Sequence, residues 1–407
     1  MKFSTNLLSN LRLYVFYLFI AINSHINALP NITLEKYGNL KTENITIILQ
    51  RALNDIDNKC LILPKGILSI KDVQIENKKN FKIKGDSTII QCGKFDIKNC
   101  NNFDISQIQV HGTINKFAYF NIIGNCYRFS IHHCSFYSEK DNNQNNTFYG
   151  IHIMCDKSQT QKSFNNSPRE FKIYQNKIKN TRFDGILIHA LCSNFKIYKN
   201  SIQDSQCIGI EIEGRLGNNK NTTVFPCKQG NIYNNNITNC GDWGILLMWV
   251  QNVNIYNNIC NNNNGCFLSI GSQNIHIYKN SFEGTQKGFE ISQEYYSINK
   301  GINDNIWIYK NKIIGRPRAE QRGVIDIRHA RNISINKNAI SCKYKKNSAC
   351  ISIASAQNII IKRNYIKRTN KQFFNKIIFT EAPDPENRHI YPMTSDKNLI
   401  KNNIFTK

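Results

Sequence analysis

Apolar and polar residues alternate through most of the chain, a two-residue period that predicts β-strands rather than helices. A short phrase with this period recurs, for example "FKIYQNKI" at 171–178, "FKIYKNSI" at 195–202 and "WIYKNKI" at 307–313. The Ile on which these phrases align recurs at irregular intervals, and the shortest intervals are of about 22 residues, which is typical of a solenoid with loops inserted on some turns. The aligned residues are Ile83, Ile105, Ile131, Ile173, Ile197, Ile232, Ile255, Ile277, Ile308, Ile335 and Ile361.

A second strand lies in most repeats, about twelve residues before the next aligned Ile. Examples are "GILIH" at 185–189, "GIEIE" at 209–213 and "VIDIR" at 324–328. Short strands, polar turns and a short repeat predict a parallel β-helix, in which successive rungs stack about 4.8 Å apart. We therefore expect an all-β protein: a single-stranded parallel β-helix of about 11 rungs, forming one domain over residues 29–407.

Two polar or aromatic columns accompany the Ile column. Asn follows the aligned Ile by three residues in eight rungs, from Asn176 to Asn364, and we expect it to adopt a left-handed turn conformation and to bond to its equivalents along the axis. Tyr follows the Ile directly in six rungs, from Tyr174 to Tyr309. We expect the Tyr rings to face outward and stack between rungs, although such a stripe also suits sugar binding.

The ends of the rod require caps, because a solenoid exposes its core there. Residues 42–57 place Ile48, Ala52, Leu53 and Ile56 on one helical face, which predicts an N-terminal capping helix. Residues 369–407 lose the strand period and gain prolines, so we expect a C-terminal cap there.

Residues 1–28 carry basic residues, a short apolar run and a polar end, the pattern of a secretory signal peptide. An uncleaved N-terminal anchor is the alternative. No later stretch is apolar enough to span a membrane. We therefore predict a secreted, extracellular protein.

The chain contains 14 cysteines, which suits an oxidising compartment. Three short spacings suggest local disulfides, although spacing does not set connectivity: Cys126 with Cys134, Cys207 with Cys227, and Cys342 with Cys350. No cysteine or histidine spacing resembles a zinc site, so we predict neither a metal nor another cofactor.

The formal net charge of +25 favours a polyanionic partner. The alternative is composition bias, because Lys, Asn and Ile are all abundant and the lysines are spread along the chain. A polysaccharide, acidic or neutral, is the partner we expect. Nucleic acid is not expected, since no nucleic-acid-binding motif is present, and the sequence leaves the oligomeric state open.

The chain resembles the pectin-lyase-like superfamily of right-handed parallel β-helices. Residues 43–70, "ENITIILQRALNDIDNKCLILPKGILSI", are similar to the superfamily's entry segment of helix, strand and Pro-Lys-Gly turn, and the rungs extend the likeness over nearly all of residues 29–407. The resemblance implies a right-handed coil. It implies no single reaction, because the superfamily includes hydrolases, lyases, epimerases, esterases and adhesins.

Part of the chain is also similar to polygalacturonase-type glycoside hydrolases, which carry paired acids, a His and a basic triplet on successive rungs. Of the paired acids only Asp184 matches. Phe148 and Tyr149 stand where the first acid would lie, Ile208 replaces the His, and 246–248 replace the basic triplet. The resemblance therefore supports the frame and argues against standard polygalacturonase activity.

The Gly-Ile-x-Ile strands contain the candidate catalytic residues, at positions expected to face outward and to be exposed. Glu211 and Glu213 share one strand face, with Cα atoms about 6.6 Å apart. Two such carboxylates can act as acid and base across a glycosidic bond, and their repulsion raises the pKa of one. His189 and Asp184 lie one rung away. The alternative is a set of solvated surface residues.

Trp243 and Trp249 flank the next strand and are candidate substrate-binding platforms, or else fill a groove beneath a loop. Insertions at 138–170 and 214–230 are expected to wall this region. A second substrate-binding patch contains Glu290, Asp326 and Arg328. There Arg328 would neutralise a uronate beside a base, unless the patch is only a surface ion pair.

These features predict a secreted carbohydrate-active enzyme that hydrolyses glycosidic bonds in a polysaccharide. A polyuronate lyase or epimerase is the first alternative. A non-catalytic glycan-binding or adhesin-like protein is the second, because the matching hydrolase motifs are incomplete.

Overall fold

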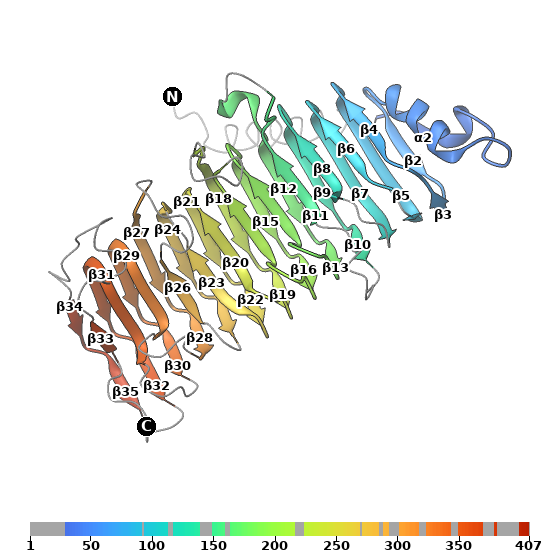
Figure 1. The fold of residues 1–407 in the computed structure, drawn as a ribbon. Helices are drawn as coiled ribbons and strands as arrows, with labels where there is room; N and C mark the ends of the chain where they lie inside the picture. Colours follow the sequence, from blue (N-terminus) through green and yellow to red (C-terminus); the bar gives the residue numbers. More distant parts are fainter. Residues whose placement is uncertain are drawn as a thin grey trace, which may run out of the picture.

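The computed structural model describes residues 29–91, 93–112, 117–138, 149–158, 163–215, 224–268, 271–284, 288–292, 301–316, 323–342, 349–368, 378–380 and 399–406. Thirty-five strands form one continuous sheet, in which each strand pairs in parallel with its equivalents on the rungs before and after it. Figure 1 shows these strands stacked into a rod, with the N-terminal helix at one end. The predicted parallel β-helix is confirmed.

The sheet wraps around the rod as three faces, called here the first, second and third sheets. The first sheet carries the aligned Ile, and β5, β7, β29 and β31 each bend to serve two sheets. Its strands are β1 (Asn31–Thr33), β2 (Cys60–Leu63), β5 (Lys79–Gln91), β7 (Asn101–Gly112), β9 (Tyr127–His132), β12 (Arg169–Tyr174), β15 (Ser193–Tyr198), β18 (Cys227–Tyr233), β21 (Val250–Tyr256), β24 (Gln273–Tyr278), β27 (Asn303–Tyr309), β29 (Gly323–Asn336), β31 (Ala349–Lys362) and β34 (Leu399–Lys401).

The second sheet follows the first along each rung. Its strands are β3 (Gly66–Ser69), β10 (Ser135–Ser138), β13 (Lys177–Lys179), β16 (Ser201–Gln203), β19 (Asn236–Thr238), β22 (Ile259–Asn261), β25 (Ser281–Glu283), β28 (Lys312–Gly315), β30 (Ala339–Cys342), β32 (Tyr365–Arg368) and β35 (Ile404–Thr406). The third sheet carries the Gly-Ile-x-Ile segments. Its strands are β4 (Val73–Glu76), β6 (Phe95–Lys98), β8 (Ala118–Ile123), β11 (Tyr149–Met154), β14 (Ile186–His189), β17 (Ile210–Glu213), β20 (Trp243–Met248), β23 (Asn264–Leu268), β26 (Phe289–Ile291) and β33 (Ile378–Thr380).

The aligned Ile residues form one continuous column in the first sheet. Each pairs in register with the next, from Ile83 with Ile105 to Ile335 with Ile361, and every one is fully buried. The column continues beyond the predicted rungs, because Ile361 also pairs with Ile400. Residues 399–406 therefore form part of a further rung within the predicted cap at 369–407. Residues 369–377, 381–398 and 407 lie outside the described part of the chain.

The Asn residues form a buried ladder along the rod. The side-chain amide of Asn235 donates to Asn258 Oδ1 at 2.9 Å and to the carbonyl of Ile197 at 3.0 Å, and the same pattern recurs from Asn176 to Asn403. The residue before each ladder Asn has the left-handed backbone conformation. For example, φ is 56° at Asn234 and 55° at Asn257. The predicted axial bonding is confirmed. The predicted left-handed conformation belongs to the neighbouring residue, because the ladder side chain must turn inward.

The Tyr column stacks as predicted. Successive rings from Tyr174 to Tyr309 lie 4.8–5.0 Å apart and nearly parallel. A second, internal stack runs from Phe81 to Phe195, and Gly230 leaves space for the last ring of that stack. Both columns follow from the in-register pairing of equivalent residues.

The N-terminal cap is α2 (Ile45–Asn54), which Asn44 caps by accepting a hydrogen bond from the backbone N–H of Thr46 at 2.9 Å. The predicted apolar face is buried against the first rungs, and Ile56 is buried just after the helix ends. Two short 3-10 helices, η1 (Leu34–Lys36) and η2 (Phe164–Asn166), complete the described elements.

The described cysteines are thiols, so the suggested local disulfides are not formed among them. Burial raises the pKa of most of these thiols, including Cys126 and Cys134, because a thiolate is poorly solvated inside the coil. Cys192 contacts Cys227 on the next rung, and Cys342 contacts Cys350. The suggested partner of Cys227, Cys207, instead contacts the Asp184 carboxyl.

The predicted signal peptide at 1–28 lies outside the described residues. Across the part of the chain that the structure describes, no helix has the length and apolar character needed to cross a membrane.

Candidate active site

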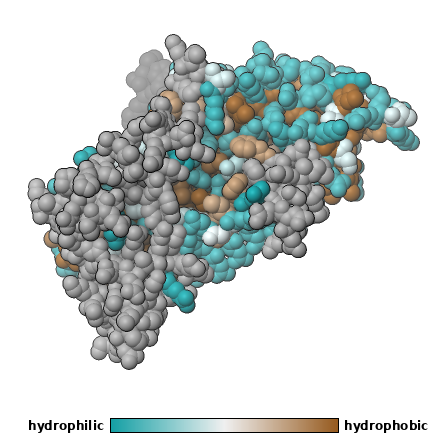
Figure 2. Space-filling view, viewed as in Figure 1, coloured by the Kyte–Doolittle hydropathy of each residue, from teal (hydrophilic) through white to brown (hydrophobic). Residues whose placement is uncertain are grey.

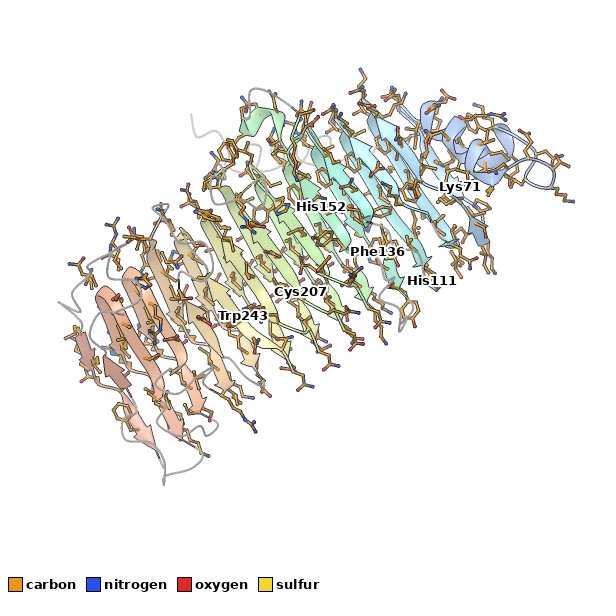
Figure 3. The ribbon with its side chains drawn as sticks, in the orientation of Figure 1. Lys71, His111, Phe136, His152, Cys207 and Trp243 are labelled. Atoms are coloured by element: carbon orange, nitrogen blue, oxygen red, sulfur yellow. The ribbon has the colours of Figure 1, made fainter. Side chains whose placement is uncertain are left out.

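The candidate residues lie on the outward side of the third sheet, most of them on neighbouring rungs. Among them Figure 3 labels Trp243, in the middle of the rod. In-register pairing forms two columns there. One contains Asp96, Asn121, His152, Leu187, Glu211, Leu246, Phe267, Glu290 and Asp326. The other contains Met154, His189, Glu213 and Met248.

Most of this surface is covered, although the side chains point away from the core. His152 is fully buried, and Glu213, Glu290 and Asp326 are each less than 5% exposed. The expectation of an open, exposed column is therefore wrong. The sequence period correctly separates core-facing from outward positions, but it does not predict which inserted segments cover the outward side.

Asp184, two residues before the start of β14, and Glu211 on β17 form a carboxyl pair. Their side chains are hydrogen-bonded, and the backbone N–H of Ile208 donates to Asp184 Oδ1 at 3.0 Å. Burial, together with the adjacent Glu211, raises the pKa of Asp184 well above that of an ordinary carboxyl. Burial also raises the pKa of Glu211. Two carboxyls in contact in a desolvated site hold a proton between them, which is the state of a proton donor.

His189 and Glu213 form the second part of the site. His189 Nε2 lies 2.7 Å from Glu213 Oε2, and the other carboxylate oxygen forms an ion pair with Arg215. Burial, with the charges of Lys157 and Arg215, lowers the pKa of His189 to about 4. At neutral pH the ring is therefore uncharged and can exchange a proton with the adjacent carboxylate.

The hydrogen-bonded set continues over three rungs to residues that the sequence reasoning missed. His152 Nε2 lies 3.5 Å from His189 Nδ1, and His152 Nδ1 lies 2.8 Å from Asn121 Oδ1. Asn121 donates to Asp96 Oδ1 at 2.8 Å. Burial lowers the pKa of His152 well below its ordinary value. Aligning 95–98 and 118–123 with the Gly-Ile-x-Ile strands would have found Asp96 and Asn121, because they occupy the same column.

Trp243 and Trp249 are only 2% and 6% exposed. They pack with Ile208, Leu246 and Met248 in a separate apolar cluster on the outside of the coil. Figure 2 shows apolar surface in the middle of the visible face, among hydrophilic residues. The two indoles are therefore buried in this cluster and do not present open stacking platforms.

The predicted walls are present in part. The backbone N–H of Leu191 donates to the Phe225 carbonyl at 3.1 Å, and Phe225 donates to the Gly214 carbonyl at 2.7 Å. Phe164 and Phe225 pack against a small cluster that contains Leu191. These contacts bring both insertions to the His189 end of the site; residues 139–148, 159–162 and 216–223 lie outside the description.

The second predicted patch is a buried cluster rather than a surface ion pair. Glu290 and Asp326 are partners across β26 and β29. Arg328 Nε lies 3.2 Å from Asp326 Oδ2, and the Ser352 hydroxyl donates to Asp326 Oδ1 at 2.5 Å. The patch shares a column with Glu211, but the Leu246 and Phe267 rungs separate the two acid groups.

A hollow of about 580 Å³ lies away from this site, on the second sheet. It is lined by His111, Tyr137 and Lys177 among others, and Figure 3 shows His111 and Phe136 toward that edge of the rod. None of the candidate catalytic carboxyls lines this hollow. Among the residues that the structure describes, no group of His, Cys, Asp and Glu has a metal-binding arrangement.

A family model described as "Right handed beta helix region" matches residues 171–298. A search of curated proteins found no matching sequence. Three solved structures are similar in fold. The catalytic domain of Agl-KA has a TM-score of 0.61 at 13% identity, covering 93% of this chain and 69% of that chain. The A-module of the Azotobacter vinelandii mannuronan C-5 epimerase AlgE6 has a TM-score of 0.55 at 12% identity, covering 92% and 99%.

The Yersinia enterocolitica family 28 exopolygalacturonase has a TM-score of 0.58 at 9% identity, covering 88% of this chain and 79% of that chain. At these identities the likeness concerns the fold. Together with the in-register columns and the family match, it agrees with the architecture predicted from the repeats. The chain therefore has a right-handed parallel β-helix fold, which it shares with these solved structures.

Proposed function

We propose that the chain is an exported carbohydrate-active enzyme that hydrolyses glycosidic bonds in a polysaccharide. The observation that carries the proposal is the Asp184–Glu211 carboxyl pair, because burial raises both pKa values and contact with Glu211 raises that of Asp184 further, which retains a proton in the site. Export rests on the pattern of residues 1–28. The net charge of +25 favours an acidic polymer.

In this proposal Glu211 is the proton donor. Glu211 is partly exposed whereas Asp184 is only 3% exposed, so Glu211 is the member that reaches a glycosidic oxygen. Asp184 shares the proton and holds it ready for transfer. Transfer of the shared proton to the leaving oxygen leaves two carboxylates in contact, and a proton from solvent then restores the pair.

Glu213 is the second carboxyl of the reaction. It lies two residues from Glu211 on the same face of β17, about 6.6 Å away between Cα atoms, a separation that leaves room for water. With His189 at 2.7 Å, it accepts the proton of the attacking water. The similar fold of an exopolygalacturonase supports a glycan substrate by analogy.

A polyuronate lyase or epimerase is a second candidate, favoured by the uncharged imidazoles. Burial keeps the pKa values of His152 and His189 low, so both rings are uncharged at neutral pH, and the partly exposed His189 can accept a proton from a sugar carbon. Tyr149 lies beside the acid pair and, with its pKa raised by burial, stays protonated as a donor. The similar fold of a mannuronan epimerase agrees with this chemistry.

The test is turnover of a panel of neutral and acidic polysaccharides by the full chain, with reducing ends and unsaturated uronates measured together. Hydrolysis predicts new reducing ends without unsaturated product, and a loss of at least about 100-fold in Glu211→Gln. Glu283→Gln, a surface carboxylate that pairs with Lys312, is the matched control and should retain activity. Unsaturated products would transfer support to the lyase, and binding without turnover would contradict the enzyme proposal.

A further inference from the structure

We propose that Asp96, Asn121, His152, His189 and Glu213 act as one proton-accepting relay that spans five successive rungs. The proposal deepens the role given above to Glu213 and rests on the proposed function for its use in catalysis. The relay itself is a property of the folded chain and can be measured without a substrate.

The relay contains four consecutive contacts. They are Asp96 Oδ1 to Asn121 Nδ2 at 2.8 Å, Asn121 Oδ1 to His152 Nδ1 at 2.8 Å, His152 Nε2 to His189 Nδ1 at 3.5 Å, and His189 Nε2 to Glu213 Oε2 at 2.7 Å. Each contact joins neighbouring rungs of the third sheet, so the line of groups runs along the rod axis.

A count of protons shows why these groups act together. Four contacts need four bridging protons, one for each hydrogen bond. The two carboxylates, each paired with a cation, supply none. Each uncharged imidazole supplies one, and the amide supplies one toward one of its two neighbours. The neutral-pH set therefore holds three protons for four contacts and is one proton short.

Reversing the Asn121 amide does not remove the deficit. When the Asn121 amide nitrogen points toward Asp96, the amide oxygen faces His152 Nδ1, and this contact requires a proton on His152 Nδ1. With its nitrogen toward His152, the amide oxygen meets the carboxylate, and that contact then lacks a proton. Water does not supply the missing donor at His152, because this side chain is fully buried.

One proton taken up at Glu213 completes all four bonds. It bridges Glu213 Oε2 and His189 Nε2, so that His189 carries its other proton on Nδ1 and donates to His152 Nε2. His152 then carries its proton on Nδ1 and donates to Asn121, which donates to Asp96. No bond other than N–H and O–H bonds forms or breaks, and the relay gains one positive charge.

Several charged groups face the relay. Lys94 lies 2.9 Å from Asp96, and Lys98, in the next column, lies 3.4 Å from Asp156. Lys157 and Arg215 act on His189, and Arg215 also pairs with the outer oxygen of Glu213. These cations oppose uptake of a positive charge, whereas completion of the hydrogen bonds favours it.

The carboxyl pair and the relay therefore have different roles in catalysis. The Asp184–Glu211 pair retains a proton that it can donate. The relay lacks one proton and can accept it when water or a sugar carbon loses one. Asp96 is then a positioning residue, because it affects proton uptake by the relay through Asn121 and does not contact a substrate.

The test is nuclear magnetic resonance of the full chain labelled with ¹⁵N at histidine, titrated from about pH 4 to pH 9 without substrate. The ring nitrogens report charge and tautomer directly. Glu213→Gln and Asp96→Asn each replace a carboxylate with an amide that supplies the missing proton. Glu283→Gln removes a carboxylate outside the relay and is the control.

The expected result is a single proton uptake sensed at the same midpoint by His152 and His189, after which both rings carry a proton on Nδ1. That transition should be lost in Glu213→Gln and Asp96→Asn and kept in the control. A transition confined to one ring, no transition, or a transition unchanged in both amide variants would overturn the relay. Glycan turnover is a separate measurement, so failure of the relay and failure of the proposed function are distinguishable.

Discussion

His189 Nε2 lies 2.7 Å from Glu213 Oε2, although the two residues are 24 positions apart in the sequence. They are register partners across β14 and β17, so the coil itself brings them together. Arg215 fixes the other carboxylate oxygen. A repeat that builds a regular rod thus also brings an imidazole and a carboxylate into contact at the proposed site.

Stability should depend on His189 below neutral pH. Its pKa is about 4 in the fold against 6.5 ordinarily, so between these values the unfolded chain binds more protons. The unfolding free energy therefore falls as pH falls from about 6.5 to 4, by about 3 kcal/mol for this group. Chemical denaturation of the wild type and His189→Gln at pH 7 and pH 4.5 measures it. An equal loss in both proteins would contradict the assignment.

The acid pair should produce the opposite dependence. Because the pKa of Asp184 is raised, its contribution is fully present below the unfolded value and is lost as pH rises through the folded value. Asp184→Asn keeps an acceptor for the Ile208 N–H and carries no charge. We expect this variant to lose activity. As pH rises from 5 to 8, its unfolding free energy should fall less than that of the wild type, as followed by denaturant midpoints. A parallel decline in the two proteins would argue against the retained proton.

The Asn ladder should be a large local source of stability. Asn258 donates to Asn280 Oδ1 and to the Ile232 carbonyl, and it accepts from the Asn235 side chain. Asn258→Ala leaves these buried groups without partners, which costs about 4 kcal/mol.

Asn257→Ala is the matched control for the ladder variant. Asn257 has φ 55° and does not belong to the ladder, so its replacement costs only about 1 kcal/mol of left-handed strain. Urea unfolding compares the two variants. Equal losses would show that the turn conformation, rather than the ladder, supplies the stability.

Gly230 should be required by the end of the Phe stack. A Cβ atom at this position would lie 2.1 Å from the Phe195 ring, so Gly230→Ala overpacks the core and costs about 3 kcal/mol. Phe195→Leu should recover part of that loss in the double variant, because it removes the opposing ring atoms. Additive losses in the double-mutant cycle would contradict the proposed contact.

The sequence was sufficient to predict the rungs, because one structural unit is written many times. The Ile column, the stacked tyrosines and the apolar face of α2 are all confirmed. The sequence predicted the C-terminal end less well, because Ile400 continues the Ile column there after a long interruption in the repeat. It placed Asp184 beside the Glu211 rung, but it missed Asp96 and Asn121, since these lie in rungs without the Gly-Ile-x-Ile phrase.

The sequence by itself determined the period, and with it the inward or outward direction of each side chain, because alternation along a strand is a local property. Only the tertiary structure decided which outward groups are desolvated. Trp243 is buried in an apolar cluster, and Asp184 is a buried acid with a raised pKa and a hydrogen bond to Glu211. Those outcomes depend on the stacking of rungs and on covering segments that are distant in sequence, so no local pattern encodes them.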